Sequence, residues 1–328
     1  TIILEKRPVG KPQLSDFKFT DTELPQIGAN EVLLKTSLVS VDPYLRGRMS
    51  DAKSYSAPFQ LQQPISSGIV AEVLESNNVA YTKGDYVSGL LEWKEFQKSE
   101  GKGLLKVDPA KAPLSAYLGV LGMTGLTAYL GLTEIGKPKK GETLVVSGAA
   151  GAVGSVVGQI GKLLGCRVVG IAGTDEKAEM LKAKYGFDAA INYTTTSNMK
   201  EAIATACPDG VDVYFDNVGG DITDGVLANI NQLARIIICG SISVYNETSV
   251  PMGPRVETTL VKNSALMQGF IVSNYAAKFP EAISQLSSWL QAGKLTYSET
   301  IIDGFDQIPQ AFIGLFEGQN NGKMIVKI

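Results

Sequence analysis

Residues 147–155 read Ser-Gly-Ala-Ala-Gly-Ala-Val-Gly-Ser, and they stand between an apolar run at 143–146 and a helical pattern that begins at Val156. A second apolar run follows at 167–172. The order strand, glycine-rich turn, helix, strand is the unit that places a dinucleotide pyrophosphate at a helix N-terminus. Small residues let the backbone approach the phosphates, whose charge then faces the amides and the positive end of the helix dipole. Ala149 takes the place of the first glycine of the usual fingerprint, so the motif is A-x-G-x-x-G. The stretch predicts nucleotide binding, with an ordinary turn as the alternative.

Strand and helix patterns alternate from Gly141 to about residue 292. Such alternation is typical of a parallel sheet with helical crossovers. We expect six strands, at 143–147, 167–172, 189–193, 211–216, 235–240 and 266–272. We expect helices at 154–165, 176–185, 197–206, 223–231 and 278–292. The fold class predicted is therefore α/β, with a doubly wound Rossmann domain.

The sequence on either side of this region has a different character. Residues 1 to about 115 contain short β patterns separated by turn residues, as at 31–36 and 68–74. From about 294 the chain returns to short strands and one helix. We therefore expect a β-rich catalytic or substrate domain from 1–120 with 294–328, and a Rossmann domain from 121–293. The uncharged stretch 112–133 fits a buried helix between domains, from Leu114 to Leu132, better than a membrane span.

Composition limits the partners and the compartment. A formal net charge of −3, with no Lys/Arg run, gives no electrostatic case for nucleic acid or an anionic membrane. The N-terminal residues lack a long apolar segment, so no secretory signal is expected. The three cysteines, Cys166, Cys207 and Cys239, are widely spaced, which argues against a disulfide framework and favours a cytoplasmic protein.

The chain contains no histidine. This removes the commonest general base and the commonest zinc ligand. Ser-His-Asp and Cys-His nucleophile systems are excluded in their standard forms, as is a zinc site built from Cys and His. No clustered Asp/Glu motif suggests a carboxylate site, so we predict no metal.

The residues after the second strand of the Rossmann unit bear on the choice of dinucleotide. An NAD site usually carries an acid at the tip of this strand for the ribose 2′-OH. Here the strand ends Ile171-Ala172-Gly173-Thr174, and acids follow only at Asp175 and Glu176, where they fit the start of the next helix. Lys177, one turn in, could bind a 2′-phosphate or be an ordinary surface lysine. Without an acid at the tip, NADPH is the favoured cofactor.

With these residues in hand, the chain resembles the medium-chain dehydrogenase/reductase superfamily. It is most similar to the zinc-free branch of leukotriene B4 12-hydroxydehydrogenase/prostaglandin reductases, alkenal double-bond reductases and bacterial curcumin reductase. The resemblance spans nearly the whole chain and implies a GroES-like barrel for the β-rich domain. The motifs that carry it are Val41–Met49, Leu121–Tyr129, the 147–155 loop, Phe215–Gly220, Cys239–Ser243, Gln268–Val272 and Gly318–Lys323.

The resemblance also implies roles for particular residues. Ala152, Val153 and Gly154 would form the pyrophosphate turn. Lys177 and Tyr193 would hold the adenosine 2′-phosphate, and Gly173 would also belong to the cofactor site. The nicotinamide half would lie near residues that follow the later strands: Asn217, Cys239, Ser241, Tyr245, Phe270, Val272 and Asn320. Tyr44, Met123 and Lys262 would face the substrate, with Tyr44 and Tyr245 as catalytic candidates.

Ordinary structural roles remain open for several of these residues. Tyr193 can be a strand-end aromatic, Asn217 a turn residue before two glycines, and Tyr44 a packed loop aromatic. For Arg46 and Arg48 we favour a structural ion-pair cluster. The chain also departs from its relatives. Lys262 stands where animal and plant members carry a tyrosine, Thr124 replaces a common proline, and Ser66-Ser67 replaces a glycine-rich pair.

The expected function is NADPH-dependent, metal-free reduction of the C=C bond of α,β-unsaturated ketones and aldehydes. Hydride would go to the β-carbon, and preorganised donors would stabilise the enolate. A quinone reductase on the same scaffold and a non-catalytic nucleotide-binding relative are the alternatives. The resemblance also leads us to expect a homodimer.

Overall fold

The computed structural model describes all residues from 1 to 328 and divides into two compact units. The N-terminal unit comprises Thr1–Gly119, Glu299–Asn320 and Met324–Ile328, and the Rossmann unit comprises Val120–Ser298 and Asn321–Lys323. The two units are described separately below. The α/β fold class is confirmed.

The Rossmann unit contains a parallel six-stranded sheet in the order β10-β9-β8-β11-β12-β13. Numbered along this unit, the order is 3-2-1-4-5-6, which is that of a doubly wound dinucleotide fold. The strands are β8 (Thr143–Val146), β9 (Arg167–Ala172), β10 (Ala189–Asn192), β11 (Val211–Asp216), β12 (Ile230–Ile238) and β13 (Leu266–Gly269). Four of the six predicted strands keep their bounds to within one residue.

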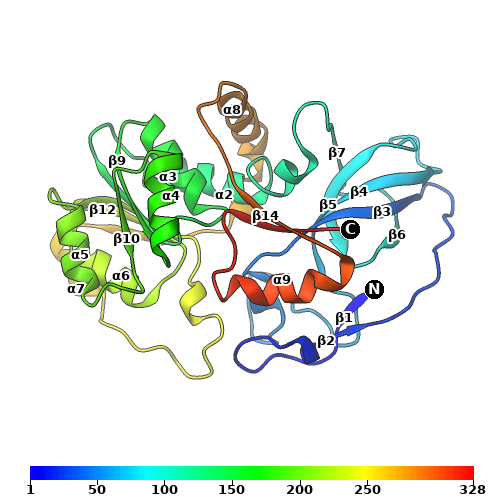
Figure 1. Ribbon diagram of the computed structural model, residues 1–328, viewed down its shortest axis with the longest axis horizontal. Helices are drawn as coiled ribbons and strands as arrows, with labels where there is room; N and C mark the ends of the chain where they lie inside the picture. The colour runs from blue at the N-terminus through cyan, green and yellow to red at the C-terminus, as the bar shows by residue number, and fades with distance from the viewer. The chain divides into compact units, whose positions relative to one another are not determined.

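Helices cover both faces of this sheet (Figure 1). They are α2 (Met123–Leu130), the π-helical turn η3 (Gly131–Gly136), α3 (Gly154–Leu163), α4 (Asp175–Tyr185), α5 (Met199–Ala206), α6 (Gly220–Leu227), α7 (Glu257–Asn263) and α8 (Phe279–Gln291). Glycines on α3 allow close packing: a Cβ on Gly161 would lie 2.5 Å from Leu144, and one on Gly158 would collide with Phe187.

Three predicted elements differ from the structure. The helix expected from Leu114 to Leu132 is broken, because Gly119–Gly122 turns back and brings the Val120 carbonyl against Gly125, where a Cβ would clash at 1.8 Å. The helix expected at 223–231 ends at Leu227, and β12 begins early, with a left-handed residue at Leu233 that breaks its alternation. The last strand ends at Gly269, before the 3-10 segment η5 (Val272–Lys278).

The N-terminal unit is built around a mixed sheet in the order β14-β15-β3-β4-β5-β7, with β6 also paired to β3. The pairs from β15 to β7 are antiparallel, whereas β14 runs alongside β15 in the same direction. Its strands are β3 (Val32–Ser40), β4 (Ser66–Ser76), β5 (Tyr86–Glu92), β6 (Phe96–Ser99), β7 (Leu105–Val107), β14 (Glu299–Asp303) and β15 (Lys323–Lys327). A separate pair consists of β1 (Ile2–Leu4) and β2 (Phe17–Phe19), and the helices are α1 (Leu45–Arg48) and α9 (Ile308–Leu315).

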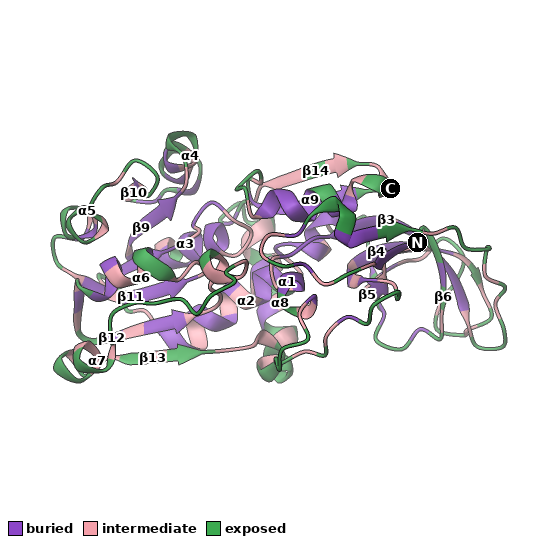
Figure 2. Ribbon diagram, turned by 90° about the horizontal axis from the view of Figure 1, so that it is seen from below, coloured by how far each residue is buried: buried purple, intermediate pink, exposed green.

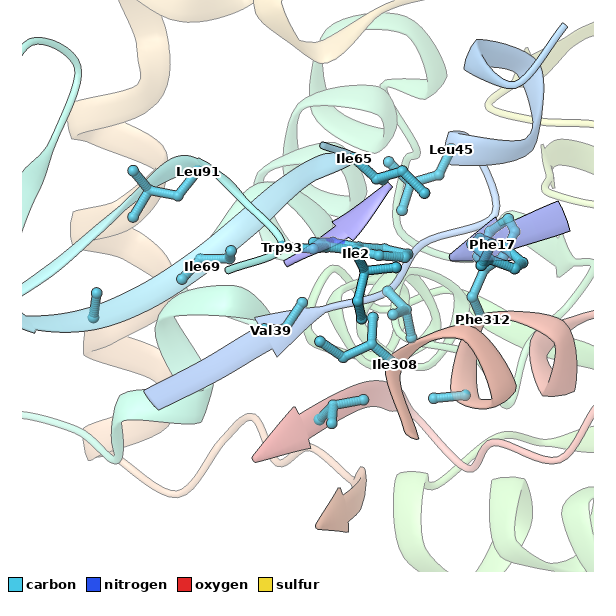
Figure 3. Packing of buried hydrophobic residues seen from close by; sticks show 14 of the residues in the cluster. Ile2, Phe17, Val39, Leu45, Ile65, Ile69, Leu91, Trp93, Ile308 and Phe312 are labelled. Atoms are coloured by element: carbon cyan, nitrogen blue, oxygen red, sulfur yellow. The ribbon is translucent and has the colours of Figure 1, made fainter. Parts of the chain in front are cut away.

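The core of the N-terminal unit joins β1, β2 and α9 to one face of the sheet (Figure 3). Phe17 stacks on Trp93 with ring centroids 6.3 Å apart and meets Phe312 edge to face. The buried Trp93 donates its indole N–H to Ser67 Oγ at 2.8 Å, which satisfies the one polar atom of its side chain. The serine pair at 66–67 therefore has a structural role at its second position.

No helix of the protein combines the length and the apolar character needed to cross a membrane.

Candidate functional site

The glycine-rich loop has the geometry of a phosphate-binding turn. It leaves β8 at Val146, and α3 begins at Gly154, so the Ala152 and Val153 amides precede the first turn of the helix. A Cβ on Gly154 would lie 2.4 Å from the Gly148 carbonyl oxygen and 2.7 Å from Ala149 Cα. Only glycine allows this approach of backbone to backbone. The amides at the helix start and the helix dipole fit an anionic pyrophosphate.

The C-terminal segment braces this loop within the same unit. Gly322 N donates to the Ala150 carbonyl at 2.8 Å, and Gly322 forms an isolated parallel bridge with Gly151. Gly322 has a positive φ, and a Cβ there would lie 1.9 Å from the Ser298 carbonyl oxygen. Asn320, the predicted cofactor residue, precedes Gly322 by two positions and belongs to the N-terminal unit.

Gly173, Lys177 and Tyr193 come together at the ends of β9 and β10. Tyr193 N donates to Ala172 O at 3.0 Å, and a Cβ on Gly173 would lie 3.0 Å from Tyr193 Oη. Thr174 caps α4 by accepting from Lys177 N at 3.2 Å. Lys177 is half-buried, and burial lowers the pKa of its ammonium group. A dianionic phosphate beside that ammonium would offset the cost of its burial.

The two acids after the tip of β9 belong to the helix start. Asp175 accepts from Asn192 Nδ2 at 2.8 Å, which ties α4 to the end of β10. Hydrogen bonds from its own backbone amide and from Thr174 lower the pKa of Glu176. Neither acid belongs to the strand tip itself, which ends in Gly173.

Asn217 lies at the carboxyl end of β11, beside the glycine-rich loop. Its backbone N–H donates to Ser147 Oγ at 2.8 Å, and its Nδ2 donates to the Ser147 carbonyl, also at 2.8 Å. Gly219 and Gly220 follow with positive φ, and the turn leads into α6. Asn217 is therefore a turn residue that is fixed against the end of β8.

Cys239, Ser241 and Tyr245 follow the end of β12. Cys239 N donates to the Asp216 carbonyl at 2.8 Å. Burial and the nearby Asp216 raise the pKa of the Cys239 thiol to about 12, which keeps it protonated. Tyr245 Oη accepts from Ser241 N at 3.3 Å, and burial raises the pKa of its phenol. A phenol held in this way is a hydrogen-bond donor rather than a base.

Phe270 and Val272 stand at the end of β13. Phe270 N donates to the Ile238 carbonyl at 3.4 Å, and the Phe270 ring meets Phe215 edge to face at 6.3 Å. A Cβ on Gly131 would press on both rings. The Phe270 ring is therefore partly buried against Phe215, and Val272 begins η5.

Tyr44 belongs to the N-terminal unit, immediately before α1. It is partly buried, and desolvation together with the neighbouring Asp42 raises the pKa of its phenol.

Arg46 donates to the carbonyls of Pro8 and Gly10. Arg48 lies over the Phe59 ring, 4.0 Å from its centroid, and donates to Ala57 O at 3.1 Å. Both arginines hold loops through these contacts.

Met123 and Lys262, both predicted to face the substrate, lie in different places in the Rossmann unit. Met123 opens α2 and is 39% exposed. Lys262 lies in the last turn of α7, and its carbonyl accepts from the side chain of Gln232 near the start of β12. This is the amino edge of the parallel sheet, opposite the loop, because strands run from that edge toward the site. The assignment of Lys262 to the substrate stays a prediction.

Ser147 and Asp216 are site residues that the sequence analysis did not single out. Both are buried at the carboxyl ends of neighbouring strands, and Ser147 Oγ donates to Asp216 Oδ1 at 2.8 Å. The available signal was a polar residue at the carboxyl end of each of two apolar runs. The structure brings together no group of three or more His, Cys, Asp or Glu side chains able to hold a metal ion.

The comparisons with known proteins cover the whole chain. Residues 1–107 match the family model of the N-terminal domain of oxidoreductases, and residues 152–288 match that of zinc-binding dehydrogenases. A putative NADP-dependent oxidoreductase of Bacillus subtilis is 56% identical over 100% of this chain and 97% of its own. The NADPH-dependent curcumin reductase of Escherichia coli is 43% identical over 99% of this chain and 96% of its own.

The crystal structure of CurA from Vibrio vulnificus in complex with NADPH superposes with a TM-score of 0.94, at 44% identity over 99% of this chain and 98% of that one. The chain belongs to the medium-chain dehydrogenase/reductase superfamily. Its branch includes the curcumin, prostaglandin and 2-alkenal reductases. Quinone oxidoreductases of known structure, at 19–21% identity, share the fold.

Proposed function

We propose that this chain reduces the C=C bond of α,β-unsaturated ketones and aldehydes with hydride from NADPH and without a metal. The observation that carries the proposal is the match, over nearly the whole chain, to reductases named for curcumin and for 2-alkenals, at 43% and 40% identity. Curcumin and 2-alkenals share a C=C bond conjugated to a carbonyl group. The quinone reductases share only the fold, so enones are favoured over quinones.

The chain is an NADPH-dependent oxidoreductase, as its relatives are, so the predicted cofactor is confirmed. The residues of the Rossmann unit fit this group. The turn at Gly154 admits a pyrophosphate, and Lys177 beside Gly173 and Tyr193 forms a cationic end for the 2′-phosphate. Asn217, Ser241 and Tyr245 follow the adjacent strand ends, and we propose them for the other half of the dinucleotide.

NADPH, when bound, supplies a hydride equivalent, and that hydride goes to the β-carbon of the enone. The protein must then hold the developing negative charge on the carbonyl oxygen and allow a proton to reach the α-carbon. We propose Tyr245 for the first task. Its hydroxyl accepts from Ser241 N, which leaves its own proton free for a substrate oxygen. Tyr44 is the second phenol we propose for substrate contact. Its raised pKa keeps it a neutral donor.

The test is product analysis after turnover with NADPH carrying deuterium at the transferred position of C4. We expect a saturated ketone with deuterium on the β-carbon and no further reduction, because nothing in the site supplies the strong acid or metal that an alkoxide needs. Deuterium on a carbinol carbon would refute the proposal. A panel with a quinone and the matching saturated ketone separates the competing reactions, and full activity after exhaustive chelation is expected.

We further propose that the protein works as a cytoplasmic homodimer. Figure 2 shows β13 coloured as exposed at the edge of the parallel sheet. Its outer backbone groups have no strand partner, Leu266 is 47% exposed, and nearby Val261 is 79% exposed. An edge of this kind suits antiparallel pairing with a second copy. Light scattering of the protein and of Leu266→Asp tests this: a monomeric parent protein would contradict it. Cell fractionation tests the compartment.

A further inference from the structure

Asp216, the last residue of β11, carries a buried carboxylate without a cationic partner. It is 1% exposed and accepts hydrogen bonds from five protein groups. Four donors converge on Oδ1, and one reaches Oδ2. The Oδ1 donors are Ser147 Oγ at 2.8 Å and Tyr214 Oη, Val218 N and Gly219 N, each at 2.9 Å, while Thr223 Oγ1 reaches Oδ2 at 2.5 Å. A charge without solvent persists only when its hydrogen-bonding capacity is filled in this way.

The position of this carboxylate in the sheet is distinctive. From β8 the chain proceeds to β9 and β10 on one side and later to β11 and β12 on the other, so β8 and β11 flank the switch point where ligands bind in such folds. The Asp216 side chain binds Ser147 at the end of β8. Its carbonyl accepts from Cys239 N at 2.8 Å and Gly240 N at 3.1 Å, which follow β12. One residue therefore ties together three strand ends around the crevice.

The bonds form a directed relay toward Asn217. Asn217 N donates to Ser147 Oγ, and that hydroxyl donates to Asp216 Oδ1, both at 2.8 Å. Because the carboxylate can only accept hydrogen bonds, the Ser147 hydroxyl must donate its proton to Asp216. A lone pair of the Ser147 oxygen is then available to accept from the Asn217 N–H. Polarisation along such a chain strengthens each bond. The relay sets the position of the Asn217 backbone, from which its side chain extends.

We propose that Asp216 is a positioning residue for hydride transfer, acting through Ser147 and Asn217. It orders the edge of the crevice against which the nicotinamide half of the cofactor is held. This inference rests on the proposed NADPH-dependent reduction. It assigns Asp216 no contact with the substrate and no proton transfer. The residues predicted for the adenosine end lie after β9 and β10, and none of them donates a hydrogen bond to Asp216. They are Gly173, Lys177 and Tyr193.

The hydroxyl groups that donate to the two oxygens of Asp216 allow a matched pair of variants. Ser147→Ala and Thr223→Val each remove one hydroxyl donor from the same buried carboxylate. Ser147 lies on the relay to Asn217, whereas Thr223 lies on α6 and bonds otherwise only to Tyr214. Both variants should lower the melting temperature by a similar amount. Only Ser147→Ala should disturb the position of Asn217.

The experiment measures enone turnover and, separately, ligand binding. We expect Ser147→Ala to lose about 10- to 100-fold in kcat, the scale at which small misplacements of reacting groups act. We expect Thr223→Val to stay close to the parent protein. Titration by nicotinamide fluorescence should show weaker NADPH binding in Ser147→Ala, while adenosine 2′,5′-bisphosphate binds as in the parent. Asp216→Asn, nearly the same shape, should fold and lose kcat like Ser147→Ala.

Two results would overturn the inference. Equal loss of kcat in Ser147→Ala and Thr223→Val would show that the carboxylate only stabilises the fold. Unchanged kcat and NADPH affinity in Ser147→Ala would show that the relay does not reach the site. A parent protein that binds NADPH but reduces no enone would contradict the proposed function, and the two titrations would then still decide the role of Asp216.

Discussion

Replacing Lys177 by alanine should convert a preference for NADPH into near indifference between NADPH and NADH. Lys177 stands in the first turn of α4, with its amide capped by Thr174, so the substitution leaves the helix start intact. Burial lowers the pKa of the ammonium, and a 2′-phosphate beside it favours the charged form again. A charge-assisted hydrogen bond of this kind contributes about 1.5–3 kcal/mol, or roughly 10- to 150-fold in the dissociation constant.

The measurement is the dissociation constant of each cofactor for the parent protein, Lys177→Ala and Lys182→Ala. Lys182 is the control, because it lies on the same helix, is 47% exposed at its side chain and pairs with Glu179 at 2.6 Å. We expect only Lys177→Ala to weaken NADPH, with NADH nearly unchanged. The preference should also fall below about pH 6, where a phosphate monoester gains a proton. Equal loss for both cofactors would refute the assignment of Lys177.

Three further changes have definite expected outcomes. Gly154→Ala should abolish measurable NADPH binding in a fluorescence titration, because its Cβ would lie 2.4 Å from Gly148 O; retained binding would mean that the loop adjusts freely. Thr124→Val should raise the free energy of unfolding by about 1 kcal/mol, since the buried Thr124 hydroxyl has no hydrogen-bond partner, and denaturant unfolding that shows a loss would contradict this. Tyr245→Phe should lower kcat while leaving NADPH affinity nearly unchanged. Because burial raises the pKa of Tyr245, the phenol stays protonated further into alkaline pH than an ordinary tyrosine. Activity that depends on it should persist there, and an early alkaline loss would point to another group.

The parallel sheet could be predicted from the sequence because its strands are short apolar runs bounded by turn residues. Arg167–Ala172 and Val211–Asp216 have the predicted bounds. The prediction failed where tertiary contacts decide the backbone. Nothing local in Leu114–Leu132 shows that the chain must turn at Gly119–Gly122 to bring Val120 against Gly125. Helical periodicity through residues 228–231 gave no sign that β12 starts at Ile230 to pair with Val211.

The residues of the candidate site also divide into those that local sequence indicates and those that only the tertiary structure brings together. Gly154 and Lys177 follow from the chemistry of a phosphate near a helix start, which depends on residues close together in the sequence. Tyr193 was assigned from the resemblance to the family. Asp216 depends on which strands become neighbours. Ser147 and Asp216 are 69 residues apart, and only the order β8-β11 places one hydroxyl against the other's carboxylate. Strand order is therefore the information that a single sequence lacks, and in this fold it determines which polar residues meet at the switch point.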